Sequence, residues 1–273
     1  MAKTSAYENN GGSQIPFFRS PLWDIIQFVI LLSVLGWLAG RSASNIGYNW
    51  QWYRIPQYLF IETDTGYSIG PLLKGLLITL KISSISLVFA FIIGLVTAML
   101  RLSNSFVARS LATLYLEISR NTPLLIQIFF IYFVLGPTLG LERMPSAILA
   151  LSLFEGAYTS EIFRSGIQSV AKGQSEAGKT IGLTTFGIYR HIIIPQAVRT
   201  ILPPLASQAI SLVKDSALVS TIAIYDLTMQ AQALISESYL TFEIWFTVAV
   251  IYLAITVFLS LAVGFMEKRL KLP

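Results

Sequence analysis

Long apolar runs separated by short polar segments dominate the chain. At 1.5 Å rise per residue, a run of about 20 residues can cross an apolar layer of roughly 30 Å as a helix, and only the first run is short for this. The pattern predicts an all-α polytopic transmembrane helix bundle of about six spans. The expected spans are Asp24 to Ala39, Leu72 to Leu100, Leu111 to Leu135, Pro145 to Ile167, Thr200 to Ile222 and Phe242 to Phe265.

Composition supports the membrane interpretation. Hydrophobic residues make up 54% of the 273 residues and charged residues only 12%, and the mean hydropathy is +0.67. Soluble domains carry about twice that share of charge, so most soluble folds are excluded. With no cysteine and a single histidine, His191, neither disulfides nor a Cys/His metal site is expected, and we expect no cofactor.

Lysine and arginine residues indicate the orientation. If the N-terminus is cytoplasmic, twelve of them fall in cytoplasmic segments, and only Arg41, Arg54, Lys74 and Arg143 lie outside. This bias follows the positive-inside rule, so both termini are expected in the cytoplasm. It also accounts for the net charge of +5 without a nucleic-acid partner.

The domain organisation follows from these segments. We expect a cytoplasmic tail over 1–23, an extra N-terminal transmembrane helix over 24–40, an external connection over 41–70 and a transmembrane core over 71–273. The first apolar run also resembles a signal peptide, but its long polar lead favours an uncleaved helix. The aromatic residues of the external connection suit an interfacial anchor, and docking of an external partner is the alternative.

A polar, patterned cytoplasmic loop over about 169–199 separates the fourth and fifth spans. Ser175 and Glu176 suit a helix N-terminus, Gly182 should end that helix, and Pro195 should break the next. Gly173 to Thr180 also matches the phosphate-binding pattern G-x-x-x-x-G-K-[ST]. We reject that match because no buried strand precedes it.

The same loop resembles the EAA motif of ABC importer permeases, E-A-A-x-x-x-G, nine residues, I-x-L-P. The matching residues are Glu176, Ala177, Gly178, Gly182, Ile192, Ile194 and Pro195, with Gly178 and Ile194 departing from the motif. Further segments resemble polar amino acid permeases, namely Arg120 to Gln127 (R-G-T-P-L-L-x-Q), Gly156 to Arg164 (G-A-Y-x-x-E-x-x-R), Pro195 to Arg199 (P-Q-A-x-R) and Leu212 to Leu218 (L-x-K-x-[ST]-x-L). The resemblance covers about 72–270.

This resemblance implies the membrane subunit of a type I ABC importer without a catalytic site of its own. The implied partners are a second permease, identical or related, two ABC ATPases that use ATP and Mg, an external substrate-binding protein, membrane lipid and a small amino acid substrate. The loop around Glu176 would dock on the ATPase, so the implied coupling residues are Glu176, Ala177, Gly178, Gly182 and Pro195.

Charged residues within the spans are candidates for substrate contact. Glu155 lies about 15 Å into its span, and Tyr158 and Thr159 should share its face. Glu155 could receive a substrate ammonium, or instead pair with Lys81 or Lys214. Glu117 and Arg120 should form an ion pair, although Arg120 could reach a substrate carboxylate. The full candidate set is Glu117, Arg120, Thr122, Gln127, Glu155, Tyr158, Thr159 and Lys214.

Two other functions compete with the importer subunit. An ion-coupled secondary transporter could use Glu155 and Lys214 as a relay, but the chain lacks the repeated halves that are frequent in such proteins. A membrane enzyme would need a nucleophile, base or metal cluster that the sequence does not supply. Neither requires the patterned loop around Glu176.

Overall fold

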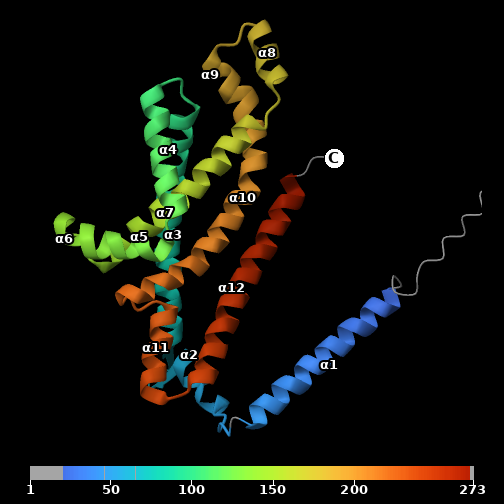
Figure 1. The fold of residues 1–273 in the computed structure, drawn as a ribbon, viewed down its shortest axis with the longest axis vertical. Helices are drawn as coiled ribbons and strands as arrows, with labels where there is room; N and C mark the ends of the chain where they lie inside the picture. The colour runs from blue at the N-terminus through green and yellow to red at the C-terminus, as the bar shows by residue number, and fades with distance from the viewer. Residues whose placement is uncertain (1–20, 46, 65, 271–273) are drawn as a thin grey trace, which may run out of the picture. The chain divides into compact units, whose positions relative to one another are not determined.

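The computed structural model describes residues 21–45, 47–64 and 66–270, so nearly all of the expected tail lies outside the described residues. The chain divides into two units, Met1–Trp50 and Gln51–Pro273. The first unit contains the helix α1 (Pro21–Asn45), whose described apolar side chains, such as Phe28 and Trp37, are about half exposed. The second unit contains all the remaining elements (Figure 1).

The connection that precedes the bundle contains short elements. These are η2 (Trp52–Arg54), α2 (Pro56–Leu59) and the strands β1 (Phe60–Thr63) and β2 (Gly66–Ile69), which pair antiparallel with Phe60 opposite Ile69. This hairpin is the only strand structure among the described residues, and the all-α prediction did not include it. The backbone N–H of Gln51 donates to the buried Glu243 at 2.7 Å, which fixes the connection to the last helix.

Five helical stretches form the bundle. They are α3 (Pro71–Leu102); α4 (Phe106–Asn121) with α5 (Leu124–Phe129), the π-helical η3 (Phe130–Leu135) and α6 (Gly136–Leu139); α7 (Arg143–Gln168); α9 (Thr185–Ile188) with the π-helical η4 (Tyr189–Ile193), α10 (Ile194–Asp215) and the 3-10 helix η5 (Ser216–Ile222); and α12 (Thr241–Leu270). The short helices α8 (Lys172–Thr180) and α11 (Leu227–Ser238) lie at opposite ends of this unit (Figure 1).

By length and hydropathy, the described helices supply two to four membrane spans, where the sequence pattern predicts about six. α3 and α12 qualify alone, and two further pairs qualify only if each bent pair is one span. α1 has a shorter apolar stretch, Trp23–Leu38. α7 does not qualify; it carries Glu155, Glu161 and Arg164 and is largely buried within the unit.

The expected third span, Leu111 to Leu135, is broken. α4 and the α5–α6 stretch meet at 110°, because Thr122 and Pro123 adopt extended backbone conformations between them. A residue before proline is biased away from the helical region, and proline supplies no N–H to continue the helix. The α5–α6 stretch therefore projects sideways from the bundle as an arm (Figure 1).

Small side chains bring α3 and α7 into close contact. Most buried positions along α3 carry small side chains close to a four-residue repeat, namely Gly75, Thr79, Ser83, Ser86, Ala90, Gly94 and Ala98, and Leu72, Ile82 and Thr97 are buried as well. Gly75 lies against Asp226, whereas Gly94 lies against α7. A Cβ on Gly94 would lie 2.6 Å from Cγ2 of Thr159, so the two backbones approach as closely as glycine allows. Small residues at this spacing are the usual means of packing helices within membranes.

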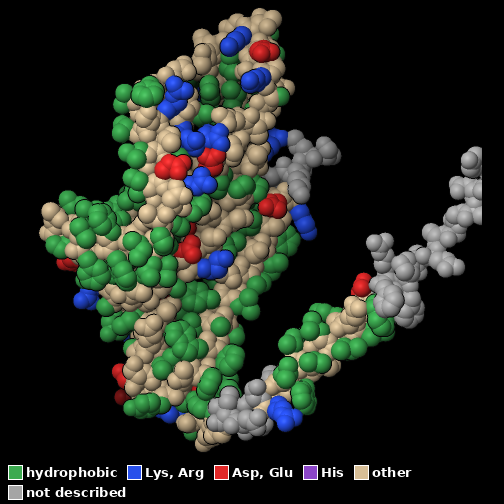
Figure 2. Space-filling model, in the orientation of Figure 1, with side chains coloured by type: hydrophobic (Ala, Val, Ile, Leu, Met, Phe, Trp, Pro, Cys, Tyr) green, Lys and Arg blue, Asp and Glu red, His purple; other side chains and the backbone are tan. Residues whose placement is uncertain are grey.

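Figure 2 shows how charge is distributed on the face in view. Hydrophobic side chains cover α12 and the α5–α6 arm, whereas Lys and Arg gather toward the end that carries α4, α8 and α9. This is the end that the positive-inside rule predicts to be cytoplasmic.

Candidate functional site

Glu155 lies at the centre of the candidate substrate site. Its side chain, on α7, is 1% exposed, and its Oε2 accepts a hydrogen bond from Nε2 of Gln208 on α10. The other carboxylate oxygen, Oε1, is buried and has no hydrogen-bond partner. The carboxyl group of Asp215 also interacts with Glu155. Two acids and one amide therefore meet between α7 and α10.

The expected lysine partners of Glu155 are not found there. Lys81 and Lys214 are both exposed, and neither forms an ion pair within the described part of the chain. Glu155 does make a contact between helices, but its partner is Gln208, so the alternative of an ion pair with a lysine is wrong. An amide can donate to a carboxylate without adding a second charge to the helix interface.

Tyr158 and Thr159 do not share one environment with Glu155. Thr159 is 2% exposed and packs against Gly94 of α3. The Tyr158 ring is 5.1 Å from the ring of Phe154, and the guanidinium carbon of Arg120 lies 5.7 Å from its centre. At about 100° per residue, positions i+3 and i+4 lie on opposite sides of position i, which explains the divergence. Arg120 and Tyr158 are thus brought together across α4 and α7.

The predicted ion pair between Glu117 and Arg120 is wrong. Oε2 of Glu117 accepts a hydrogen bond from Nδ2 of Asn121 at 2.8 Å, and Arg120 extends to Tyr158 on the neighbouring helix. A helical i, i+3 pair contributes only a few tenths of a kcal/mol, so a ring face on a packed helix can compete with it.

Thr122 and Gln127 hold the break between α4 and α5. Nε2 of Gln127 donates to the carbonyl oxygens of Ser119 at 2.8 Å and Thr122 at 3.1 Å, and to the Thr122 hydroxyl at 2.8 Å. The Thr122 hydroxyl donates to the carbonyl of Ile118 at 2.7 Å. Carbonyls at a helix end lack intrahelical partners, and these side chains provide them.

Four of the five coupling candidates, Glu176, Ala177, Gly178 and Gly182, lie on α8 and the turn that follows it, whereas Pro195 lies in the first turn of α10. The prediction that Gly182 ends this helix is confirmed, because its φ is +82° and its N–H donates to the carbonyl of Lys179 at 3.0 Å. The N–H of Leu183 donates to the carbonyl of Gly178 at 3.0 Å. These two bonds form a Schellman motif, which requires a left-handed residue at the position of Gly182.

Two local expectations for this loop are wrong. α8 begins at Lys172 without a side-chain cap, and the Ser175 hydroxyl donates back to the carbonyl of Lys172 at 2.8 Å. Pro195 does not break a helix, because α9, η4 and α10 run on as one helical stretch. The π-helical turn η4 lies immediately before Pro195, and such a turn re-satisfies the backbone groups that proline leaves free.

The helical conformation of Lys172–Thr180 also bears on the phosphate-binding pattern. Gly173 lies in the first turn of α8 rather than in a loop between a strand and a helix. The residues that would form the phosphate loop ahead of a helix are here part of the helix itself, so beyond its first turn their backbone amides are used within the helix and do not converge on an anion. The structure agrees with the rejection of an ATP-binding loop at this position.

Two large apolar side chains are exposed beside α8. Ile181 is 75% exposed and Phe186 is 72% exposed, although they lie on an otherwise polar segment. Glu176 and Ala177 are also exposed, whereas Gly178 is buried. A Cβ on Gly178 would lie 2.8 Å from Cδ1 of Ile192, so α8 packs closely on η4. The segment therefore combines a fixed inner face with an outer face that carries exposed apolar side chains beside charged ones, Lys172, Glu176 and Lys179.

An ion-pair network links α3 to α7 near the same end. NH1 of Arg101 lies 2.6 Å from Oε2 of Glu161, and Arg164 also pairs with Glu161 and donates to Gln168. The i, i+3 spacing of Glu161 and Arg164 on one helix accounts for their pair, whereas Arg101 comes from another helix. Its contact depends on how α3 and α7 pack, which the spacing within one helix does not reveal.

Sequence reasoning also missed Gln208 and the pair of Ile181 and Phe186. A glutamine within the apolar run of α10 was a readable signal for a buried polar contact. Large apolar residues within a polar loop were a readable signal for a docking surface. The partner of Gln208, which is 53 residues away in sequence, could not be read from either signal.

The comparisons with known proteins agree with this architecture. Residues 90–272 match the family described as the inner membrane component of binding-protein-dependent transport systems. The glutamine transport system permease protein GlnP of Escherichia coli K12 is 36% identical over 208 residues, covering 75% of this chain and 95% of the relative. The probable glutamine ABC transporter permease protein GlnP of Bacillus subtilis is 40% identical over 215 residues, covering 77% and 98%.

Solved structures give the same result. The crystal structure of an amino acid ABC transporter with histidines matches with a TM-score of 0.69 at 35% identity, covering 73% of this chain and 94% of that chain. The inward-facing MetNI methionine ABC transporter shares the fold, with a TM-score of 0.63 at 20% identity, covering 74% and 96%. This chain belongs to the family of inner-membrane permease components of binding-protein-dependent ABC transport systems.

Proposed function

We propose that this chain is the permease subunit of an ATP-driven importer of polar L-amino acids and couples to a separate ATPase through α8. The observation that carries the proposal is the exposed segment around Glu176, where Ile181 and Phe186 lie uncovered beside a helix fixed by Gly182. An amphipathic helix with exposed apolar anchors is the form that docks into a groove on another protein. The glutamine permeases named above support the amino acid assignment.

The proposed assembly contains a second permease, identical or related, two ABC ATPases and an external substrate-binding protein. ATP and Mg belong to the ATPase partners, and this chain carries no catalytic site of its own. The proposed location is a bacterial inner membrane with both termini in the cytoplasm, as the distribution of Lys and Arg favours.

Within this assembly, Glu155 is the proposed receptor for the substrate's ammonium group. Burial of a carboxylate with one unsatisfied oxygen is costly, and a bound ammonium would supply the missing donors. Glu155→Gln should therefore lower the affinity for substrate or change the substrate selectivity in uptake measurements. Unaltered affinity and selectivity would remove Glu155 from the binding role. Of the other candidates, Arg120 on α4 contacts Tyr158, which lies on α7 with Glu155. Thr122, Gln127 and Thr159 are engaged in helix packing or capping.

Reconstitution tests the importer function directly. The chain, its ATPase, any second permease and the binding protein are placed in proteoliposomes, and uptake of radiolabelled amino acids is measured with and without ATP. Uptake that requires both ATP and the binding protein is expected. Uptake by this chain alone, driven by an ion gradient, would instead identify a secondary transporter. The exposure of Lys214, away from Glu155, does not favour that relay.

A further inference from the structure

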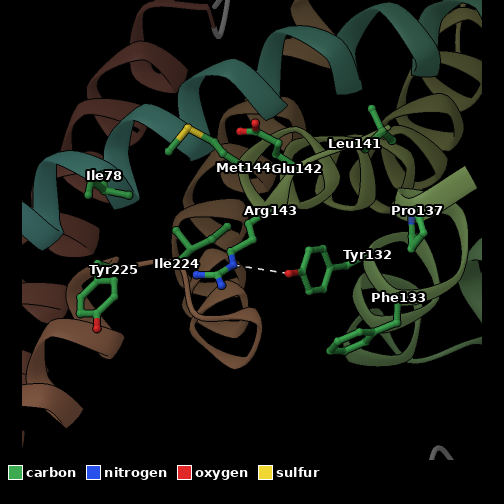
Figure 3. Close-up of a pocket in the computed structure, with 10 residues that line it drawn as sticks. All are labelled: Ile78, Tyr132, Phe133, Pro137, Leu141, Glu142, Arg143, Met144, Ile224 and Tyr225. Atoms are coloured by element: carbon green, nitrogen blue, oxygen red, sulfur yellow. Dashed lines mark hydrogen bonds between the residues drawn. The ribbon is translucent and has the colours of Figure 1, made fainter. Parts of the chain in front are cut away.

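A cavity lies at the start of α7, away from Glu155 in the middle of that helix. It has a volume of about 650 Å³ and lies between α3, the α5–α6 arm, the start of α7 and the segment after η5. Its walls are mostly apolar, with Ile78, Phe133, Met144 and Ile224 among them. Figure 3 shows the Arg143 side chain extending into the space between Tyr132 and Ile224. Two charged residues, Glu142 and Arg143, line the pocket, and the Glu142 carboxylate points away from the Arg143 guanidinium (Figure 3). A mostly apolar pocket with a few polar groups has the usual form of a small-molecule site.

Arg143 occupies a position that helix energetics disfavour. It is the first residue of α7, where the helix dipole is positive and basic residues are unfavourable. Glu142 precedes it but makes no side-chain capping bond, and its carboxylate points away from the guanidinium (Figure 3). The guanidinium and the uncapped N-terminus therefore combine to make this end of the pocket strongly attractive to anions.

The hydrogen bonds of Arg143 within the protein are weak. Its Nε donates to the Tyr132 hydroxyl at 3.4 Å and its NH1 to the carbonyl of Ala223 at 3.4 Å, both near the limit for such bonds. Among the described residues, Arg143 has no carboxylate partner. A guanidinium that is exposed, charged and only loosely held retains its planar fork for a bidentate anion.

We propose that this pocket binds the α-carboxylate of an amino acid through Arg143 at the outer mouth of the transport pathway. The inference rests on the proposed import function and on the predicted external location of Arg143. Charge selects a carboxylate, and the walls around Tyr132, Phe133 and Met144 contact the rest of the molecule. The volume suits a small molecule.

This pocket and the Glu155 site act in succession. Twelve residues of α7 separate Arg143 from Glu155, which corresponds to about 18 Å along the helix. The carboxylate and ammonium of one amino acid are attached to the same carbon, so a single molecule cannot reach both residues at once. The outer site therefore recognises the carboxylate before the inner site recognises the ammonium.

The test measures binding to the complete permease–ATPase complex in lipid nanodiscs without the binding protein. Binding of L-[³H]glutamine is displaced by unlabelled L-glutamine or by its α-carboxamide, which lacks the negative charge. The wild type should prefer L-glutamine by about tenfold, the effect of one charge-assisted contact. Arg143→Gln should weaken binding about tenfold and remove the preference, and Arg143→Lys should retain part of it. Lys74→Gln, which removes another exposed external charge, is the matched control.

Two results would overturn the inference. The first is no saturable L-glutamine binding by the wild type, and the second is an unchanged preference for L-glutamine in Arg143→Gln. If the second result comes with loss of ATPase stimulation by the binding protein, Arg143 is assigned to protein docking instead. ATP-driven uptake by the wild-type complex is measured in parallel. Its absence would refute the import function, whereas its presence with either result would refute only the outer site.

Discussion

Gly182 offers a direct test of the coupling segment, because substitution there is restricted by the backbone conformation and not by contact with neighbouring atoms. Its φ is +82°, and a Cβ placed there would meet nothing within 4 Å. Gly173, at the other end of α8, is equally open but has no positive φ. Alanine therefore meets no steric clash at either position, and only at position 182 is its backbone strained.

The expected magnitude follows from the left-handed conformation. The left-handed conformation costs any residue other than glycine about 1–2 kcal/mol of free energy, which shifts the equilibrium between the native turn and other conformations by about 5- to 30-fold. Asparagine tolerates this region better, so Gly182→Asn should lose less than Gly182→Ala. Gly173→Ala should stabilise α8 by up to about 1 kcal/mol, because alanine is the better helix former.

The assay is the number of substrate molecules imported per ATP hydrolysed in proteoliposomes. Gly182→Ala should lower this ratio several-fold, because a displaced turn misplaces Ile181 and Phe186 on the ATPase. Gly182→Arg and Glu176→Lys should uncouple further, since each also adds positive charge to the docking surface. Equal ratios for Gly182→Ala and Gly173→Ala would refute the claim that the turn geometry carries coupling.

Three further predictions concern packing and stability. Glu161→Gln should lower the free energy of unfolding of the complex by about 1 kcal/mol or less, because its two arginine contacts are partly exposed; a much larger loss in thermal unfolding would contradict this. Gly94→Ala should reduce the amount of folded protein in the membrane, since its Cβ would overlap Thr159, whereas Gly264→Ala meets nothing and should not. Gln127→Leu should destabilise the α4–α5 break by about 1–3 kcal/mol, because it leaves the carbonyls of Ser119 and Thr122 without a donor, and unchanged thermal unfolding would refute this role of Gln127.

Features determined by local sequence could be predicted. Gly182 was recognisable as a helix end because glycine after a short polar helix has few other roles. The apolar runs that became α3 and α12 were recognisable because length and hydropathy suffice for a membrane span. Both depend on residues close together in the chain.

Features determined by packing between helices could not be predicted. Arg120 had two available partners, and only the packing of α4 against α7 favours Tyr158 over Glu117. Pro195 was expected to break a helix, and the π-helical turn before it changed that outcome. Gln208 meets Glu155 only because α7 and α10 lie together, which no spacing within either helix reveals.

This same packing explains how one chain can connect ATPase docking to substrate binding. α8 packs on η4 through the close contact of Gly178 with Ile192, and η4 continues directly into α10. Gln208 lies 14 residues beyond Ile194, about 21 Å along that helix. A displacement of α8 would therefore move Gln208 relative to α7 and strain its hydrogen bond to Glu155. The carboxylate proposed to bind substrate is thus hydrogen-bonded to the helix that the proposed coupling segment would move.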